Sequence, residues 1–265
     1  MAKSKKTESE NELSLQEAAL EAERRFEENL KQRRKETIRS AESKTLIGIS
    51  LDVSGSMYAS GAVAEAQKGL DDLLKGVEAE ELLRLSVELH IDVFAESAKP
   101  VRKFGPINGC SAKSIFAELP YVGGGTNIAN AAQHLMDEVE QHQKLLRQEG
   151  QNIRYSAVFL ITDGYDSQSD ALKAAGQRIR SAEAKGSFRF IPIGVENADL
   201  NQLALLAPEP LRLAGITDFS NFFRWLIPFS RGLSQSQMGE KIPMPDLIKS
   251  ETNKDGWAER YGSIG

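Results

Sequence analysis

The sequence contains a single cysteine, Cys110, among its 265 residues. One thiol cannot form an internal disulfide or a cysteine-rich metal site, which fits a reducing compartment. The chain also lacks any run of about 18 apolar residues, and its polar start, MAKSKKTESENE, contains no apolar signal core. We therefore expect a soluble, cytoplasmic protein.

An excess of positive charge is lacking as well, because 33 Lys and Arg stand against 38 Asp and Glu, for a formal net charge of -5. Such a chain has no broad attraction for phosphate backbones or anionic lipid, so we expect neither a nucleic acid nor a membrane as partner. The 40% hydrophobic content is sufficient for a buried core, which excludes a wholly disordered protein.

The two ends of the chain differ from its middle. Residues 1–44 lack Gly and Pro and carry dense charge of both signs, which predicts a helical appendage. Ser14 and Glu17 form a capping box ahead of a narrow apolar stripe made of Leu15, Ala19, Ala22, Phe26 and Leu30. This helix either stays on its own domain or in solvent, or docks a partner through residues 14–40. Residues 233–265 lose periodicity and gain Ser, Gln, Pro and Gly, which predicts an extended or disordered tail.

Residues 45–232 alternate buried-strand patterns with amphipathic helices, which is typical of a doubly wound α/β domain. Continuous apolar runs predict central parallel strands at 45–51 and 156–162. A third candidate covers 188–195, where Pro192 argues against a central position because proline cannot donate to a ladder. Helices are predicted at 61–75, 127–146, 169–184 and 200–207, with Gly76, Gly150 and Gly186 at helix ends that need positive φ.

Two further patterns concern histidines and aromatic residues. Residues 85–93 alternate apolar and polar side chains, which predicts a strand with one wet face near a sheet edge, with residues 101–104 returning beside it. Surface roles are expected for His90, His134 and His142, since no carboxylate pattern converges on them. Core packing is expected for four aromatic residues at helical spacing, Phe219, Phe222, Phe223 and Trp225.

Three polar clusters follow predicted strands or strand-like turns, at residues 52–56, 123–127 and 162–164. Loops at the carboxyl ends of parallel strands converge on one crevice, so residues far apart in sequence can meet there. The candidate metal ligands are Asp52, Ser54, Ser56, Thr126 and Asp163. Two carboxylates and three hydroxyls, without thiolate or imidazole, suit Mg²⁺, with Mn²⁺ or Ca²⁺ as competitors. The glycines in the first two clusters would leave such an ion open to an approaching partner.

Each cluster also has a plainer interpretation. Asp52, Ser54 and Ser56 could form a turn that caps a helix, Thr126 could help cap the next one, and Asp163 could belong to a simple turn. Three unrelated caps would not require this matched set of oxygens, which favours metal binding. Nearby Asp166 and Asp170 are interpreted as a solvated loop and a helix start and are left outside the site.

Taken in order, D-x-S-G-S after an apolar strand, a glycine-flanked Thr126 and the strand-terminal T-D-G resemble the metal-ion-dependent adhesion site of the von Willebrand factor A family. The resemblance implies a three-layer α/β sandwich whose mainly parallel sheet has one antiparallel edge strand. It implies coordination by the three hydroxyls, direct or water-mediated binding by the two aspartates, and an Asp or Glu from a protein partner that completes the metal shell. Residues 222–226 are similar to bacterial stress- and tellurite-resistance-type members, which are cytoplasmic.

The leading hypothesis is a non-enzymatic adaptor that binds a partner carboxylate through its metal. The alternative is a metal-dependent phosphoesterase that uses Asp52, since the first and third clusters resemble haloacid-dehalogenase-type phosphatases. That match is incomplete, because those enzymes have D-x-D where this chain has Ser54, and no phosphate-binding lysine stands out. A serine hydrolase is disfavoured because neither Ser54 nor Ser56 lies in G-x-S-x-G and no histidine is placed as a base.

Overall fold

The computed structural model describes residues 20–34, 43–117, 125–164, 166, 168–213, 215 and 218–235. The chain divides into two units, residues 1–41 and 42–265, which are described separately. In the first unit, residues 20–34 form a helix whose side chains are all exposed. The capping box at Ser14 and Glu17 lies outside the described residues.

In the described part of the chain, six strands of the second unit form one sheet, in the order β3-β2-β1-β4-β5-β6. The strands are β1 Ser43–Asp52, β2 Val87–Phe94, β3 Ala98–Arg102, β4 Asn152–Thr162, β5 Arg189–Val195 and β6 Leu211–Leu213. Every neighbouring pair is parallel except β2 and β3, which are antiparallel. The expected mostly parallel sheet with one antiparallel edge strand is therefore confirmed.

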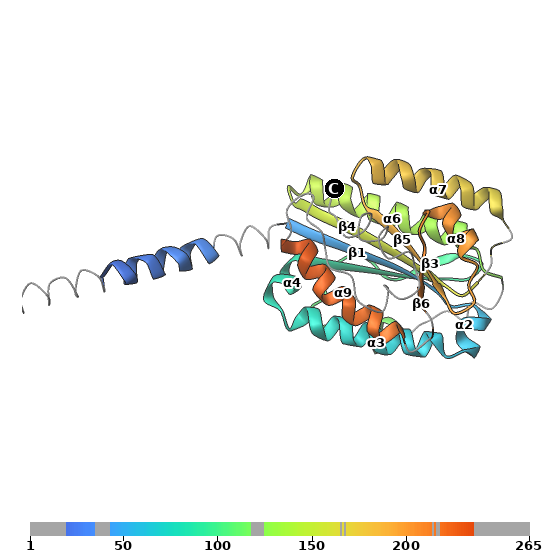
Figure 1. The fold of residues 1–265 in the computed structure, drawn as a ribbon, viewed down its shortest axis with the longest axis horizontal. Coiled ribbons are helices and arrows are strands. Elements are labelled where there is room, and N and C mark those ends of the chain that lie inside the picture. Colours follow the sequence, from blue (N-terminus) through green and yellow to red (C-terminus); the bar gives the residue numbers. More distant parts are fainter. Residues whose placement is uncertain are drawn as a thin grey trace, which may run out of the picture. The chain divides into compact units, whose positions relative to one another are not determined.

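Helices cover both faces of this sheet (Figure 1). One face carries α6 Ile128–Gln148, α7 Ser169–Ala184 and α8 Leu200–Leu206, and the other carries α3 Ala62–Glu78, α4 Glu81–Ser86 and α9 Asp218–Gln235. Two short helices, α2 Gly55–Ala59 and α5 Ala112–Ile115, lie in connections. Alternate residues of β4 divide between two cores, because Phe159 packs in the core with α3 and α9 while Val158 and Leu160 pack in the core with α6 and α7. This arrangement is a three-layer α/β sandwich.

The last described helix, α9, packs closely on α3. Its aromatic residues Phe219, Phe222, Phe223 and Trp225 are buried, as expected. Gly69 and Gly76 of α3 permit the approach, since a Cβ at Gly69 would lie 2.5 Å from Phe223 Cδ2 and one at Gly76 would overlap Ile227. The expectation that Gly76 ends a helix is therefore wrong, whereas Gly150 and Gly186 have the expected positive φ of 75° and 68°.

The carboxyl end of α9 also differs from the expectation. The helix continues through Leu233 and Ser234, which were assigned to the extended tail, and both are buried. The Ser234 hydroxyl lies 3.2 Å from Thr45 Oγ1 and 3.1 Å from Ser86 Oγ. These contacts join α9 to β1 and α4, so two residues without an obvious sequence signal belong to the core.

Pro192 lies on β5, which has a neighbouring strand on each side. It pairs with Leu160 of β4, while the pairing of β5 with β6 begins only at Ile193. Proline is therefore tolerated because no β6 residue faces it, and no ladder hydrogen bond is lost on that side.

Strand β2 corrects the expectation of a wet face near residues 85–93. All eight of its residues are buried, including Glu88, His90 and Asp92, and β3 lies outside it in the sheet. The alternating polar side chains do not face water. They face helix α6, where other polar side chains meet them.

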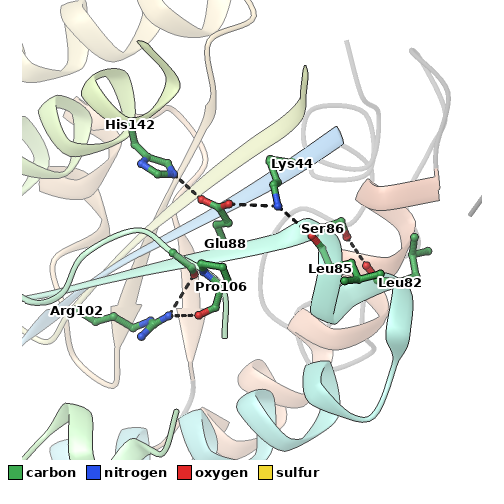
Figure 2. A network of polar contacts seen from close by, with 9 residues as sticks. Lys44, Leu82, Leu85, Ser86, Glu88, Arg102, Pro106 and His142 are labelled. Atoms are coloured by element: carbon green, nitrogen blue, oxygen red, sulfur yellow. Dashed lines mark hydrogen bonds and ion pairs between the residues drawn. The ribbon is translucent and has the colours of Figure 1, made fainter. Parts of the chain in front are cut away.

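Each of the three histidines contacts a carboxylate of β2. His142 of α6 places Nε2 at 2.5 Å from Glu88 Oε2, and Lys44 of β1 contacts the other oxygen at 3.4 Å (Figure 2). His90 is fully buried, with Nε2 at 2.7 Å from Asp92 Oδ1, and His134 Nδ1 lies 3.0 Å from Asp92 Oδ2. The surface prediction is therefore wrong for His90, whereas His134 and His142 are half-buried. Each of the three lies beside a carboxylate, which stabilises the buried polar groups.

Candidate metal centre

The expected ligands come from loops at one edge of the sheet. Asp52 is the last residue of β1, and Asp163 directly follows β4. Since β1 and β4 are parallel neighbours, their carboxyl ends lie side by side. Ser54 and Ser56 follow at the start of α2, and Thr126 immediately precedes the N-cap residue of α6.

Hydrogen bonds bring three of the five residues together directly. Ser56 Oγ donates to Asp163 Oδ1 at 3.0 Å, across 107 positions of sequence. The hydroxyl oxygens of Ser54 and Ser56 lie 3.1 Å apart. The first and third polar clusters of the sequence therefore form one continuous group of oxygens.

Asp52 lies behind this group and has no solvent exposure. Its Oδ1 accepts a hydrogen bond from Ser54 N at 2.8 Å, and its Oδ2 accepts one from Thr162 Oγ1 at 2.5 Å. Burial raises the pKa of Asp52, the hydrogen bonds from Thr162 and Ser54 partly offset that rise, and the charge of Asp163 adds to it. The hydrogen bonds to Asp52 thus offset only part of the cost of burying its negative charge, and a nearby cation would stabilise that charge.

Thr126 reaches the same place by packing. A Cβ added at Gly164 would lie 2.8 Å from Thr126 Oγ1, so the absence of a side chain lets the Thr126 loop approach the residue after Asp163. Gly125 is exposed beside it. Gly123 and Gly124, which belong to the same sequence cluster, lie outside the described residues.

The helix-cap alternative applies to one of the clusters. Asn127 Oδ1 accepts a hydrogen bond from Asn130 N at 2.9 Å and so caps α6. Ser54 occupies the N-cap position of α2 but makes no side-chain cap hydrogen bond. Its hydroxyl contacts Ser56 instead, which a purely capping role would not produce.

The group is accessible from solvent. Ser56 is exposed, Asp163 and Thr126 are half-buried, and Tyr58 nearby in α2 is 40% exposed. Within the described ranges, no group of three or more His, Cys, Asp or Glu side chains could hold a metal ion. A cation at this edge would therefore depend on hydroxyls together with the two aspartates, a donor set that suits hard ions.

Sequence reasoning missed the role of Asp166. This side chain is 1% exposed, so the expectation of a solvated loop is wrong. Its Oδ2 accepts a hydrogen bond from Ala129 N at 3.0 Å and its Oδ1 accepts one from Gln168 N at 2.7 Å. Asp166 thereby attaches the Asp163 loop to the first turn of α6. The only signal for this role in the sequence was the predicted start of that helix, because the first backbone amides of a helix lack intrahelical acceptors. Asp170 is exposed at the start of α7, as expected.

No described helix is both long and apolar enough to cross a membrane.

Comparison with known proteins gives a family match. A family model described as the von Willebrand factor type A domain matches residues 47–224. A search of curated proteins finds no match.

Solved structures share the fold at low sequence identity. Proximal thread matrix protein 1 from the mussel byssus, with a zinc-occupied adhesion-site motif, aligns at a TM-score of 0.50 and 17% identity, over 73% of this chain and 48% of that one. The conserved hypothetical protein BatB from Bacteroides thetaiotaomicron aligns at a TM-score of 0.50 and 16% identity, over 72% of this chain and 100% of that one. The pilus adhesin SpaC from Lactobacillus rhamnosus GG aligns at a TM-score of 0.55 and 13% identity, over 72% of this chain and 30% of that one. This chain thus spans about half the length of the mussel protein.

Proposed function

This chain belongs to the von Willebrand factor type A family, and on that premise we propose that it is a non-enzymatic interaction module. It binds a carboxylate of a protein partner through one divalent cation held at the sheet edge. The ion is Mg²⁺, with Mn²⁺ or Ca²⁺ as competitors, because the donors are oxygens alone. The zinc at the motif of the mussel relative supports occupancy by a divalent ion.

The assignment of ligands follows the contacts of the site. Ser54, Ser56 and Thr126 would supply hydroxyl oxygens, and Asp52 and Asp163 would bind directly or through water. Two carboxylates balance the charge of a dication, and the hydroxyls add no further negative charge. The bound ion supplies a positive charge that attracts an Asp or Glu of the partner.

One observation carries the proposal. The oxygens of Ser54, Ser56 and Asp163 form a continuous chain of contacts at 3.1 and 3.0 Å. Ser56 is exposed and Asp163 is half-buried, whereas Ser54 and Asp52 are buried behind them. A partner can therefore approach the ion from the Ser56 side without opening the core.

The phosphoesterase alternative is less favoured. A nucleophilic Asp52 would need an oxygen that faces the substrate, but the residue is fully buried and each carboxylate oxygen accepts a hydrogen bond. This arrangement suits a negative charge held in place behind a cation. It does not suit attack on a phosphate ester.

The setting of the module is part of the same proposal. We place it in the cytoplasm, in a bacterial stress-response or phosphorylation-linked assembly, on the resemblance of residues 222–226 to the stress- and tellurite-resistance type. The segment 14–40 would contribute to assembly. Within it, the helix at residues 20–34 exposes Leu20 at 63%, Phe26 at 66% and Leu30 at 43%, which leaves apolar surface for another helix.

Metal binding is tested by titrating the full chain with MgCl₂ and MnCl₂ in a calorimeter. We expect one site, with binding weakened by about a hundredfold in Asp163→Ala, because a carboxylate ligand is lost. Ser56→Ala should weaken it by about tenfold. Asp170→Ala is the matched control, since Asp170 is exposed and pairs only with Lys173 among the described residues. Equal affinity in all variants would overturn the proposed site.

Partner binding is tested by capture from the native cell extract with Mg²⁺ or with EDTA. A carboxylate-binding role requires a protein that is retained with Mg²⁺, released by EDTA, and absent when Asp163→Ala is the bait. A partner retained equally by Asp163→Ala would bind elsewhere on the chain.

A further inference from the structure

We propose that the domain has a second binding site, a pocket at the opposite edge of the sheet that takes a small molecule bearing phosphate. The pocket has a volume of about 510 Å³ and is lined where α6 and α7 end and where β4 and β5 begin. Asp163 lies beyond the other end of β4, which runs for 11 residues from Asn152 to Thr162, and Asp52 lies at the same end of the neighbouring strand β1. That length corresponds to about 35 Å, so the two sites share no residue.

The floor of the pocket is held by hydrogen bonds. Gln143 of α6 is 2% exposed, and its Nε2 donates to Ser156 Oγ at 2.9 Å and to Ser187 O at 2.5 Å. These bonds join α6, β4 and the turn after α7. Phe188, which is 3% exposed, adds an apolar part to the lining. The cavity is therefore formed before any ligand arrives.

The lining carries an excess of positive charge. The lining includes three arginines, Arg147, Arg154 and Arg189, and one carboxylate, Glu183. Oε1 of Glu183 accepts a hydrogen bond from Phe190 N at 3.0 Å. Arg154 donates to a neutral acceptor, Ser234 O, at 2.7 Å. In the part of the chain that the structure describes, none of the three forms an ion pair. By contrast, four arginines elsewhere in the described residues pair with carboxylates, namely Arg25, Arg178, Arg224 and Arg231.

The carboxyl ends of α6 and α7 do not need these arginines as hydrogen-bond donors. Backbone amides of Gly150 and Gln151 donate to the last carbonyls of α6, and those of Gly186 and Ser187 donate to the last carbonyls of α7. The helix ends are thus satisfied by their own turns. Only Arg147 lies in a last helical turn, while the other two arginines lie on β4 and β5.

The chemistry of the lining indicates the class of ligand. A guanidinium presents a planar fork of donors that matches phosphate oxygens, and three of them against one carboxylate favour a group with at least two negative charges. Side chains of Gln151, Asn152 and Ser156 add uncharged hydrogen-bonding groups. The volume lies in the range of about 300–1,000 Å³ that small-molecule sites occupy. A phosphate ester of metabolite size fits these features.

Pyrophosphate is the test probe, titrated calorimetrically into the full chain in EDTA at about 150 mM salt, where weak surface attraction is screened. We expect binding by the wild type and binding weaker by about tenfold or more in R147Q/R189Q, because two charged donors are lost. Arg154 is left unchanged because it holds Ser234. The matched control is Arg84→Gln, an exposed arginine of α4, which should bind as the wild type does.

Two further arms separate this site from the proposed metal site and from other anions. Ser56→Ala should bind pyrophosphate normally, since the pocket does not depend on the metal loops. Citrate, a carboxylate anion, should bind at least about tenfold more weakly than pyrophosphate. The proposal is overturned if the wild type does not bind pyrophosphate, if R147Q/R189Q binds equally well, or if citrate binds more tightly.

Discussion

His142 of α6 lies 54 positions from Glu88 of β2 in the sequence, yet the two side chains form a part-buried hydrogen bond (Figure 2). Lys44 of β1 contacts the same carboxylate, so three elements meet at Glu88. Burial alone would raise the pKa of Glu88. The hydrogen bond and charge of His142, with the smaller effect of Lys44, outweigh burial, so the pKa lies below its usual value.

This lowered pKa predicts how stability depends on pH. The folded state binds the Glu88 proton less readily than the unfolded state does. The stabilisation is therefore present above the ordinary value of 4.5 and is lost as the pH falls from there through the folded pKa. We expect Glu88→Gln to reduce the acid-induced loss of the free energy of unfolding between about pH 5 and about pH 3, measured by urea titration. Glu149→Gln, an exposed control, should follow the wild type, and identical profiles for all three proteins would contradict this role.

Asp166 is expected to be important for stability. Asp166→Ala removes the acceptor for Ala129 N and Gln168 N, and the buried Ala129 amide loses its partner. The free energy of unfolding should fall by about 1–3 kcal/mol. Asp170→Ala, at an exposed position of the next helix, should change it by less than about 0.5 kcal/mol. Equal stability of the two variants in urea unfolding would show that Asp166 does not hold α6.

Gly176 of α7 is predicted to resist replacement by alanine. In a free helix this change stabilises by up to about 1 kcal/mol, because glycine has the larger backbone entropy. Here a Cβ would overlap the backbone carbonyl oxygen of Leu205, so α8 would have to move. We expect Gly176→Ala to lower the free energy of unfolding by about 1–3 kcal/mol. Ser181→Ala, at an exposed position of the same helix, is the control, and a stabilised Gly176→Ala would refute the close packing.

Thr162 is predicted to position Asp52 for metal binding. Its hydroxyl donates to Asp52 Oδ2, and this hydrogen bond offsets part of the rise in the Asp52 pKa caused by burial. Thr162→Val keeps the side-chain shape but removes the donor, so Mg²⁺ affinity should fall by about tenfold to a hundredfold in calorimetry. Thr162→Ser retains the hydroxyl and should bind like the wild type. If valine and serine behave alike, the hydroxyl has no part in metal binding.

Local patterns predicted much of the framework. The apolar runs at 45–51 and 156–162 lie within β1 and β4, and α7 has the predicted bounds of Ser169–Ala184. These elements were predictable because strand burial on both faces and helical amphipathicity leave their mark on neighbouring residues. The polar clusters were visible for the same reason, since each follows an apolar strand or turn.

The environment of individual polar residues was less predictable. Glu88 and Asp166 have the sequence context of solvated residues, yet both are buried because each has a partner on α6, 54 and 37 positions away. Gly76 has the context of a helix end, but its role is to admit Ile227 of α9.

The sequence by itself determined the order of the longer strands and helices along the chain, though not β6 or the short helices α2, α4 and α5. It also determined the oxygen-only character of the candidate site, because both depend on residue types at short spacing. Only the tertiary structure decided that Ser56 contacts Asp163, that the alternating face of β2 is covered by α6, and that three arginines line one pocket. Those relationships depend on contacts between residues distant in sequence, which the pairing of strands and the packing of helices create.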